Sequence, residues 1–125
     1  MIFLDTDFLI EAVVPGSPED LQVERWLLAG EILAVSAVAW TEFLNGPVDA
    51  VQIHRGRGLI TAGIEDFTEV QAVEAARLFN ATGRRRRQKF DCLIAAAAIA
   101  SGARLATRNT ADFQLFVSHG LQLAT

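Results

Sequence analysis

Three acidic residues stand in stretches of sequence where a charge is unexpected. Asp5 directly follows the apolar run 2–4, and Glu42 and Asp91 are each the only charged residue in a long uncharged stretch. Burying a bare carboxylate costs several kcal/mol, so each side chain should face a solvated cleft, pair with a cation or bind a metal ion.

A fourth acid, Asp112, follows the apolar run 105–107 by a few residues. Asp5 and Asp112 are therefore expected near the ends of two strands, Glu42 about two turns into a helix, and Asp91 at the head of an alanine-rich helix. Sites in open parallel sheets form in the crevice at the carboxyl ends of the strands. We expect the four acids to meet there.

Such a cluster would favour a hard divalent cation. Oxygen ligands without a histidine or thiolate pattern are typical of Mg²⁺ or Mn²⁺ sites. These ions commonly act on phosphates, because they lower the pKa of bound water and neutralise charge at phosphorus. The pattern fits one ion or two.

Most of these acids also have a purely structural interpretation. Asp5 or Asp7 could cap the first helix, with Asp7 the favoured candidate, and Asp91 suits the first turn of its helix, where an acid gains about 0.3–1 kcal/mol from the dipole. Asp112 fits a cap together with Asn109. Only Glu42, in the middle of an apolar helix, has no local explanation.

A basic run lies directly before Asp91. The net charge of −4 argues weakly against a nucleic-acid partner, but this run provides a local concentration of positive charge. It is either a solvated loop or a surface for phosphates. Its members are Arg84, Arg85, Arg86, Arg87 and Lys89.

The surrounding elements predict a parallel sheet. Helices are expected to begin near residues 6, 18, 36, 48, 68 and 90, with a short helical turn over 112–116. Strands are expected at 2–4, 32–35, 64–67, 105–107 and 121–124. Strands that alternate with helices form a sheet covered on both faces, so we predict an α/β sandwich. The 125 residues suit one domain, 1–125.

The composition indicates a reducing compartment. Cys92 is the single cysteine, so no internal disulfide forms. The chain starts without a basic segment typical of a signal peptide, and no apolar run approaches the roughly 18 residues of a membrane helix. We predict a cytoplasmic protein without a membrane partner.

Four segments of this sequence resemble the PIN-domain nucleases. They are Phe3–Ile10, Thr41–Leu44, Phe90–Ala96 and Leu105–Phe113, and the last two are the most specific. Their order and spacing, with the short chain, are similar to the VapC-type toxins of prokaryotic toxin–antitoxin pairs. The resemblance covers essentially the whole chain.

The resemblance implies a fold, an activity and partners. The fold would be a PIN-like α/β/α sandwich and the activity RNA cleavage with Mg²⁺ or Mn²⁺. A homodimer and a small cognate antitoxin would be expected. The acidic quartet around the metal ion would be Asp5, Glu42, Asp91 and Asp112.

Within that quartet, Asp5 and Asp91 would be the more direct ligands by resemblance. Thr107 and Asn109 match positions that orient ligands or substrate. Asp7 stands where the family more often has asparagine, which leaves open whether it joins the metal site.

Other classes of protein share parts of this pattern. The sequence Asp5-Thr6-Asp7 after an apolar strand resembles the haloacid-dehalogenase phosphatases, but no convincing catalytic lysine follows. A phospho-receiver would need Glu65 or Asp66 at the end of a central strand. A catalytically inactive, antitoxin-binding module is the remaining alternative.

Overall fold

Five parallel strands form one sheet in the computed structural model, which describes residues 1–124. The sheet order is β3-β2-β1-β4-β5, and every neighbouring pair is parallel. The strands are β1 (Ile2–Leu4), β2 (Leu33–Ser36), β3 (Gly63–Glu65), β4 (Arg104–Ala106) and β5 (Gln122–Leu123).

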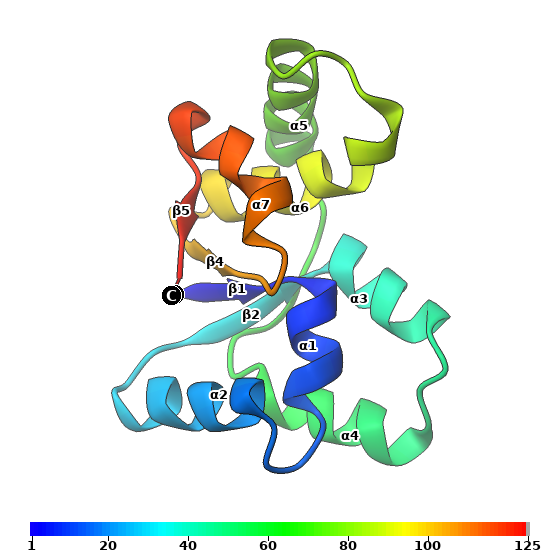
Figure 1. The fold of residues 1–125 in the computed structure, drawn as a ribbon, viewed down its shortest axis with the longest axis vertical. Helices are drawn as coiled ribbons and strands as arrows, with labels where there is room; N and C mark the ends of the chain where they lie inside the picture. Colours follow the sequence, from blue (N-terminus) through cyan, green and yellow to red (C-terminus); the bar gives the residue numbers. More distant parts are fainter. Residues whose placement is uncertain (125) are drawn as a thin grey trace.

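Helices cover both faces of this sheet. Figure 1 shows α1, α2 and α4 on one side and α5 and α6 on the other. The α-helices are α1 (Thr6–Ala12), α2 (Pro18–Leu28), α3 (Ala37–Asn45), α4 (Ala50–Leu59), α5 (Glu69–Ala81), α6 (Lys89–Ala100) and α7 (Thr110–Phe113). Two 3₁₀ turns, η1 (Arg86–Gln88) and η2 (Gln114–His119), complete the chain. The predicted α/β/α sandwich is confirmed.

The order of the strands reverses between β1 and β4. From β1 the chain builds outward through β2 and β3, and then returns to the other side of β1 with β4 and β5. Phe3 pairs with Leu105 and Leu4 with Ala106, so the two strands end level with each other. The Asp5 amide continues the ladder by donating to the Ala106 carbonyl at 2.9 Å. This is a topological switch point, where a crevice opens at the carboxyl ends of the strands.

Small side chains bring α6 into the core. The alanines 95–98 are all fully buried, and α6 contacts both α5 and β4. An apolar surface on all sides is typical of a buried helix, and the sequence predicts one here. The alanine run therefore sets how closely the helix carrying Asp91 approaches the strands.

The expected boundaries of the helices and strands are correct to within a few residues. The N-terminal caps of two helices differ in how complete they are. At the start of α5 the Thr68 hydroxyl accepts from the Gln71 amide at 3.2 Å, but the Gln71 side chain does not return the bond. Its Oε1 is buried without a partner among residues 1–124. A complete capping box instead starts α4. The Gln52 amide donates to Asp49 at 2.8 Å and the Asp49 amide to Gln52 at 2.9 Å.

Among residues 1–124, no helix has the length and apolar character needed to cross a membrane.

Ala96→Leu should destabilise the protein by about 1–3 kcal/mol, because three extra carbons have no space in a close-packed core. Ala96 is completely buried, whereas Ala100, on the same helix, is exposed. Urea denaturation should show the loss for Ala96→Leu and little change for Ala100→Leu. Equal stability of the two variants would contradict this packing.

Candidate active site

Asp5 lies at the switch point and is nearly buried. Its side chain is 6% exposed, directly after β1. One oxygen accepts from the Thr6 amide at 2.8 Å, and the other from the Thr107 hydroxyl, also at 2.8 Å. Thr107 follows β4, so this second bond spans the gap between the two central strands.

The sequence offered Asp5 and Asp7 as caps of the first helix, and Asp5 fills that role while Asp7 does not. The N-cap of α1 is Asp5, and Asp7 lies within the first turn. The Asp7 carboxylate accepts from the Arg108 amide at 3.2 Å and lies 3.4 Å from the Thr107 hydroxyl. Asp7 therefore faces the connection after β4, on the same side as Asp5.

Glu42 reaches this group from α3. It is half-buried, and its Oε1 accepts from the Thr6 hydroxyl at 2.8 Å. Thr6 is the first residue of α1, directly after Asp5. A glutamate two turns into the neighbouring helix is thus tied to the carboxyl end of β1.

Asp91 and Asp112 line a small polar pocket of about 150 Å³ together with Arg87 and Gln88. Asp91 lies in the first turn of α6 and Asp112 in α7. The pocket therefore lies between the end of the basic run and two of the predicted acids.

Asn109 links this pocket to the buried end of the site. Its amide group donates to the Asp112 carboxylate, and its backbone N–H donates to the Thr107 hydroxyl at 3.0 Å. Thr107 in turn donates to Asp5. A chain of hydrogen bonds thus runs from Asp112 to Asp5.

Electrostatic effects connect all five carboxylates. Burial, followed by the charge of Asp7, raises the pKa of Asp5 to about 7, against the lowering effect of its hydrogen bonds to Thr107 and Thr6. Burial, followed by the charges of Asp112, Glu42 and Asp7, raises the pKa of Asp91 to about 6. Within residues 1–124, none of these five acids forms an ion pair with a cation. The site carries unneutralised negative charge.

The site suits a divalent cation in charge and in chemistry, but it is not preassembled. Its donors are oxygens, as hard cations prefer. Nevertheless, no three His, Cys, Asp or Glu side chains of the described chain converge closely enough to hold one ion together. Asp112 is exposed and Glu42 is half-buried, so solvent reaches both carboxylates.

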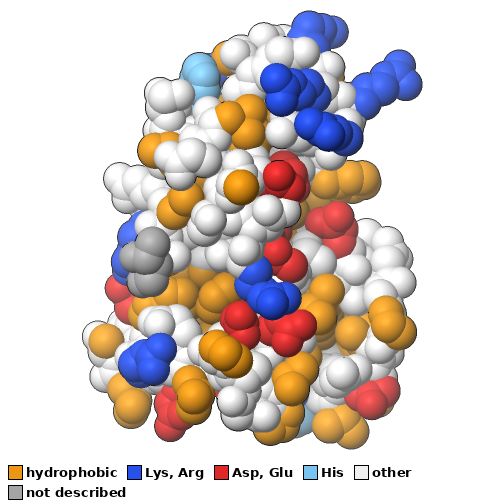
Figure 2. Space-filling model, viewed as in Figure 1, with side chains coloured by type: hydrophobic (Ala, Val, Ile, Leu, Met, Phe, Trp, Pro, Cys, Tyr) orange, Lys and Arg blue, Asp and Glu red, His pale blue; other side chains and the backbone are white. Residues whose placement is uncertain are grey.

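The basic run divides into two parts. Figure 2 shows basic side chains gathered next to acidic ones on one face of the molecule. Arg84 and Lys89 lie over the Phe79 ring, with their charged groups 5.3 Å and 5.5 Å from its centre. Arg87 instead lines the pocket with Asp91. All five members of the run are exposed.

Sequence reasoning missed the contributions of Thr6, Gln88 and Arg108. The Arg108 guanidinium lies 3.1 Å from Glu19 and 3.5 Å from Glu11 at the rim of the site. Arg108 lies within the segment 105–113 that resembles the PIN-domain nucleases, and this is the signal in the sequence that points to it. The hydroxyl contact of Thr6 joins two helices and leaves no pattern in the sequence.

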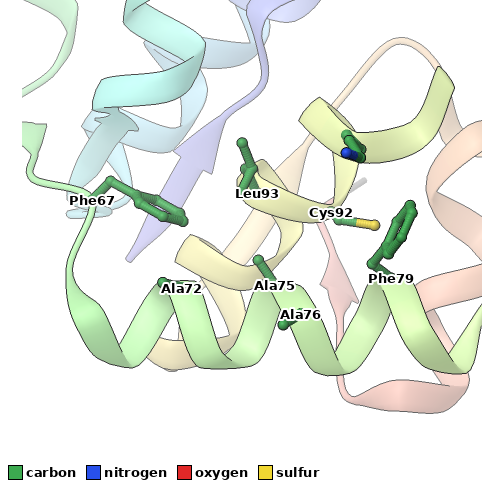
Figure 3. Close-up of a pocket in the computed structure, with 8 residues that line it drawn as sticks. Phe67, Ala72, Ala75, Ala76, Phe79, Cys92 and Leu93 are labelled. Atoms are coloured by element: carbon green, nitrogen blue, oxygen red, sulfur yellow. The ribbon is translucent and has the colours of Figure 1, made fainter. Parts of the chain in front are cut away.

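A larger, apolar pocket lies away from these acids. It measures about 300 Å³ and lies between α5 and α6, where Figure 3 shows Phe67, Phe79 and Leu93 around it. None of the acidic residues lines it. This apolar pocket is therefore separate from the candidate site.

A parallel five-stranded sheet with acids at its switch point defines an α/β class of protein with a candidate site at the carboxyl ends of its strands, and the family comparison identifies the family. The PIN domain family model matches residues 2–115, so this chain belongs to the PIN domain family. The predicted PIN resemblance is confirmed. Membership leaves the phosphatase and receiver interpretations without support, and Glu65, which a receiver would place on a central strand, ends the edge strand β3.

Several solved structures named as VapBC complexes or as a VapC toxin share this fold. VapBC2 from Rickettsia felis, bound to a promoter DNA fragment, aligns with a TM-score of 0.76 at 21% identity, covering 99% of this chain and 98% of that chain. DNA-bound VapBC from Salmonella typhimurium aligns with a TM-score of 0.74 at 20% identity, covering 98% of this chain and 96% of that chain. VapC20 from Mycobacterium tuberculosis, a sarcin–ricin-loop-cleaving toxin, aligns with a TM-score of 0.58 at 17% identity. The alignment covers 83% of this chain and 85% of that chain. Among curated proteins, the comparison found no significant match.

Asp91→Asn should stabilise the folded protein at pH 8. In the folded state the pKa of Asp91 is about 6, against an ordinary value of 3.8. Below pH 3.8 the carboxyl is protonated in both states and carries no penalty. Between 3.8 and about 6 the folded state retains a proton that the unfolded state has lost, so stability falls as pH rises, and the penalty is constant above that window.

After allowance for solvent screening, the gain should be about 1–2 kcal/mol at pH 8 and close to zero at pH 4. Urea denaturation at both pH values measures it. Asp66→Asn, at an exposed acid outside the site, is the control. The same gain for Asp91→Asn at pH 4 and pH 8 would contradict the electrostatic explanation.

Proposed function

We propose that this protein is a metal-dependent endoribonuclease, the toxin of a type II toxin–antitoxin pair. The observation that carries the proposal is the group of carboxylates, without a cationic partner in residues 1–124, at the switch point of a PIN fold. Keeping like charges together opposes folding, so their placement calls for a functional explanation. The reaction proposed is hydrolysis of an RNA phosphodiester by water, leaving a 5′-phosphate and a 3′-hydroxyl.

The proposed cofactor is Mg²⁺ or Mn²⁺, held by Asp5 and Asp91, with Glu42 and Asp112 completing the site directly or through water. When bound, such an ion acidifies water and neutralises charge that develops on the phosphate. Burial and, after it, neighbouring negative charge raise the pKa of Asp5 and Asp91, and that negative charge favours a cation.

The neighbouring polar groups have supporting roles in this proposal. Thr107 holds Asp5 by the 2.8 Å hydrogen bond to its buried oxygen. Asn109 turns the exposed Asp112 toward the pocket through its side-chain amide. Fixed donors of this kind keep carboxylates oriented toward an ion or a substrate.

Asp5→Asn and Asp91→Asn should each lower the rate of RNA cleavage roughly 100-fold or more, because each removes a charge at the reacting centre. Cleavage of labelled RNA in MgCl₂, and its loss with EDTA, measures this. Asp66→Asn, an exposed acid outside the site, should retain wild-type activity. Full activity in both site variants would refute the nuclease proposal.

The basic run is proposed to contact the RNA backbone, chiefly through Arg85, Arg86 and Arg87, since Arg84 and Lys89 lie over Phe79. Together, Arg86→Gln and Arg87→Gln should raise the KM for RNA and reduce the slope of log KM against log[KCl] by about 0.7 per lost contact. Arg25→Gln, at an exposed arginine on α2, is the matched control. An unchanged slope would assign the run to a solvated loop.

The proposed partners are a cognate antitoxin and a second copy of the chain. The proposal of an antitoxin draws on the toxin–antitoxin complexes with the same fold. A small antitoxin encoded beside the gene would be the natural inhibitor. The homodimer is proposed from the family resemblance alone.

A second candidate is a module that binds an antitoxin without cleaving RNA. One observation favours it: the acids of residues 1–124 do not form a ready-made group of three metal ligands. Titration with Mn²⁺ separates the two candidates, since an inactive module need not bind the ion and Asp91→Asn would then leave the titration unchanged.

A further inference from the structure

We propose that Thr6 is a positioning residue that holds Glu42 in place for the divalent ion. The inference rests on the proposed function, and it concerns a side chain that neither the acidic quartet nor its predicted neighbours include. Thr6 contacts two of the acids at once. Its backbone N–H donates to Asp5 and its hydroxyl to Glu42, each at 2.8 Å.

The hydroxyl of Thr6 points away from its own helix. Threonine near a helix terminus usually bonds to a nearby backbone group of the same segment. Thr6 instead donates to a glutamate on α3, 36 residues along the chain. The Ala39 carbonyl is a poorer acceptor for this proton at 3.4 Å, so the short bond to Glu42 is the one made.

This bond leaves one oxygen of Glu42 available. Oε1 accepts from Thr6, and Oε2 has no hydrogen-bond partner within residues 1–124. Glutamate has several rotatable bonds, so a donor at one oxygen restricts where the other lies. Thr6 thereby fixes Glu42 relative to Asp5, since one residue bonds to both.

Thr41 provides a control threonine: its hydroxyl lies near Glu42 in the sequence but does not bond to it. It directly precedes Glu42 on α3, but its hydroxyl donates to the Ala37 carbonyl of its own helix at 2.8 Å. Thr41→Val therefore removes a threonine hydroxyl next to Glu42 without removing a contact to any acid. Thr6→Val keeps the size of the side chain and removes only the donor, whereas Thr6→Ser keeps the donor.

The test measures Mn²⁺ affinity by electron paramagnetic resonance and kcat and KM on an RNA oligonucleotide in MgCl₂. Thr6→Val should weaken Mn²⁺ binding about 10-fold and lower kcat about 10-fold, with little change in KM, because removal of an outer partner of a metal ligand has effects of this size. Thr6→Ser and Thr41→Val should stay close to wild type. In a Glu42→Gln background, Thr6→Val should add almost nothing, since the two residues act as one unit.

Three results would overturn the proposal: wild-type Mn²⁺ affinity in Thr6→Val, equal losses in Thr6→Ser and Thr6→Val, or an undiminished effect in the Glu42→Gln background. If circular dichroism shows Thr6→Val unfolded, Thr6→Ala takes its place in the same comparisons. A wild-type protein that binds Mn²⁺ in a Thr6-dependent way but cleaves no RNA would refute the nuclease function and leave the positioning role standing. A wild type that binds no Mn²⁺ would overturn both.

Discussion

The repulsion among carboxylates at the carboxyl ends of β1 and β4 is the constraint around which the rest of this molecule is arranged. Burial and neighbouring charge both raise the pKa of Asp5 and Asp91. The fold therefore holds these acids in a place where neither water nor a cationic side chain fully stabilises their charged form. Hydroxyl and backbone donors offset part of that cost, as Thr6 and Thr107 do at Asp5. The remaining free energy must come from the apolar core, which surrounds the central strands.

The strand order explains how so small a chain can keep the acids together. Because β1 and β4 are neighbours that end level with each other, residues about 100 positions apart, such as Asp5 and Thr107, meet by hydrogen bonding. The buried alanines of α6 allow the helix that carries Asp91 to lie close to the strands. Glu42 comes from a helix beside α1, and there the connection depends on a side chain, Thr6, rather than on the sheet.

Sequence patterns could predict the scaffold and the identity of the acids, but not how the acids are held. Short apolar runs separated by helix signals gave the parallel sheet, and Asp5, Glu42 and Asp91 stood out because each interrupts apolar sequence. The sequence left both Asp5 and Asp7 as candidate caps of α1, because it carries no sign that Asp7 contacts the Arg108 amide instead. Contacts of that kind depend on tertiary geometry, which leaves no periodicity to detect.

The cations near the site show how its negative charge is preserved. Arg108 donates its backbone N–H to Asp7, yet its guanidinium lies against Glu11 and Glu19 at the rim and not against the acidic cluster. Arg87 lines the pocket of Asp91 without forming an ion pair within residues 1–124. An arginine bonded to these carboxylates would lower their pKa values and fill the space that a metal ion needs. Because Glu11 and Glu19 bind the Arg108 guanidinium, its positive charge stays near the site, where a polyanion could reach it. The carboxylates of the site then remain free for a smaller, divalent cation.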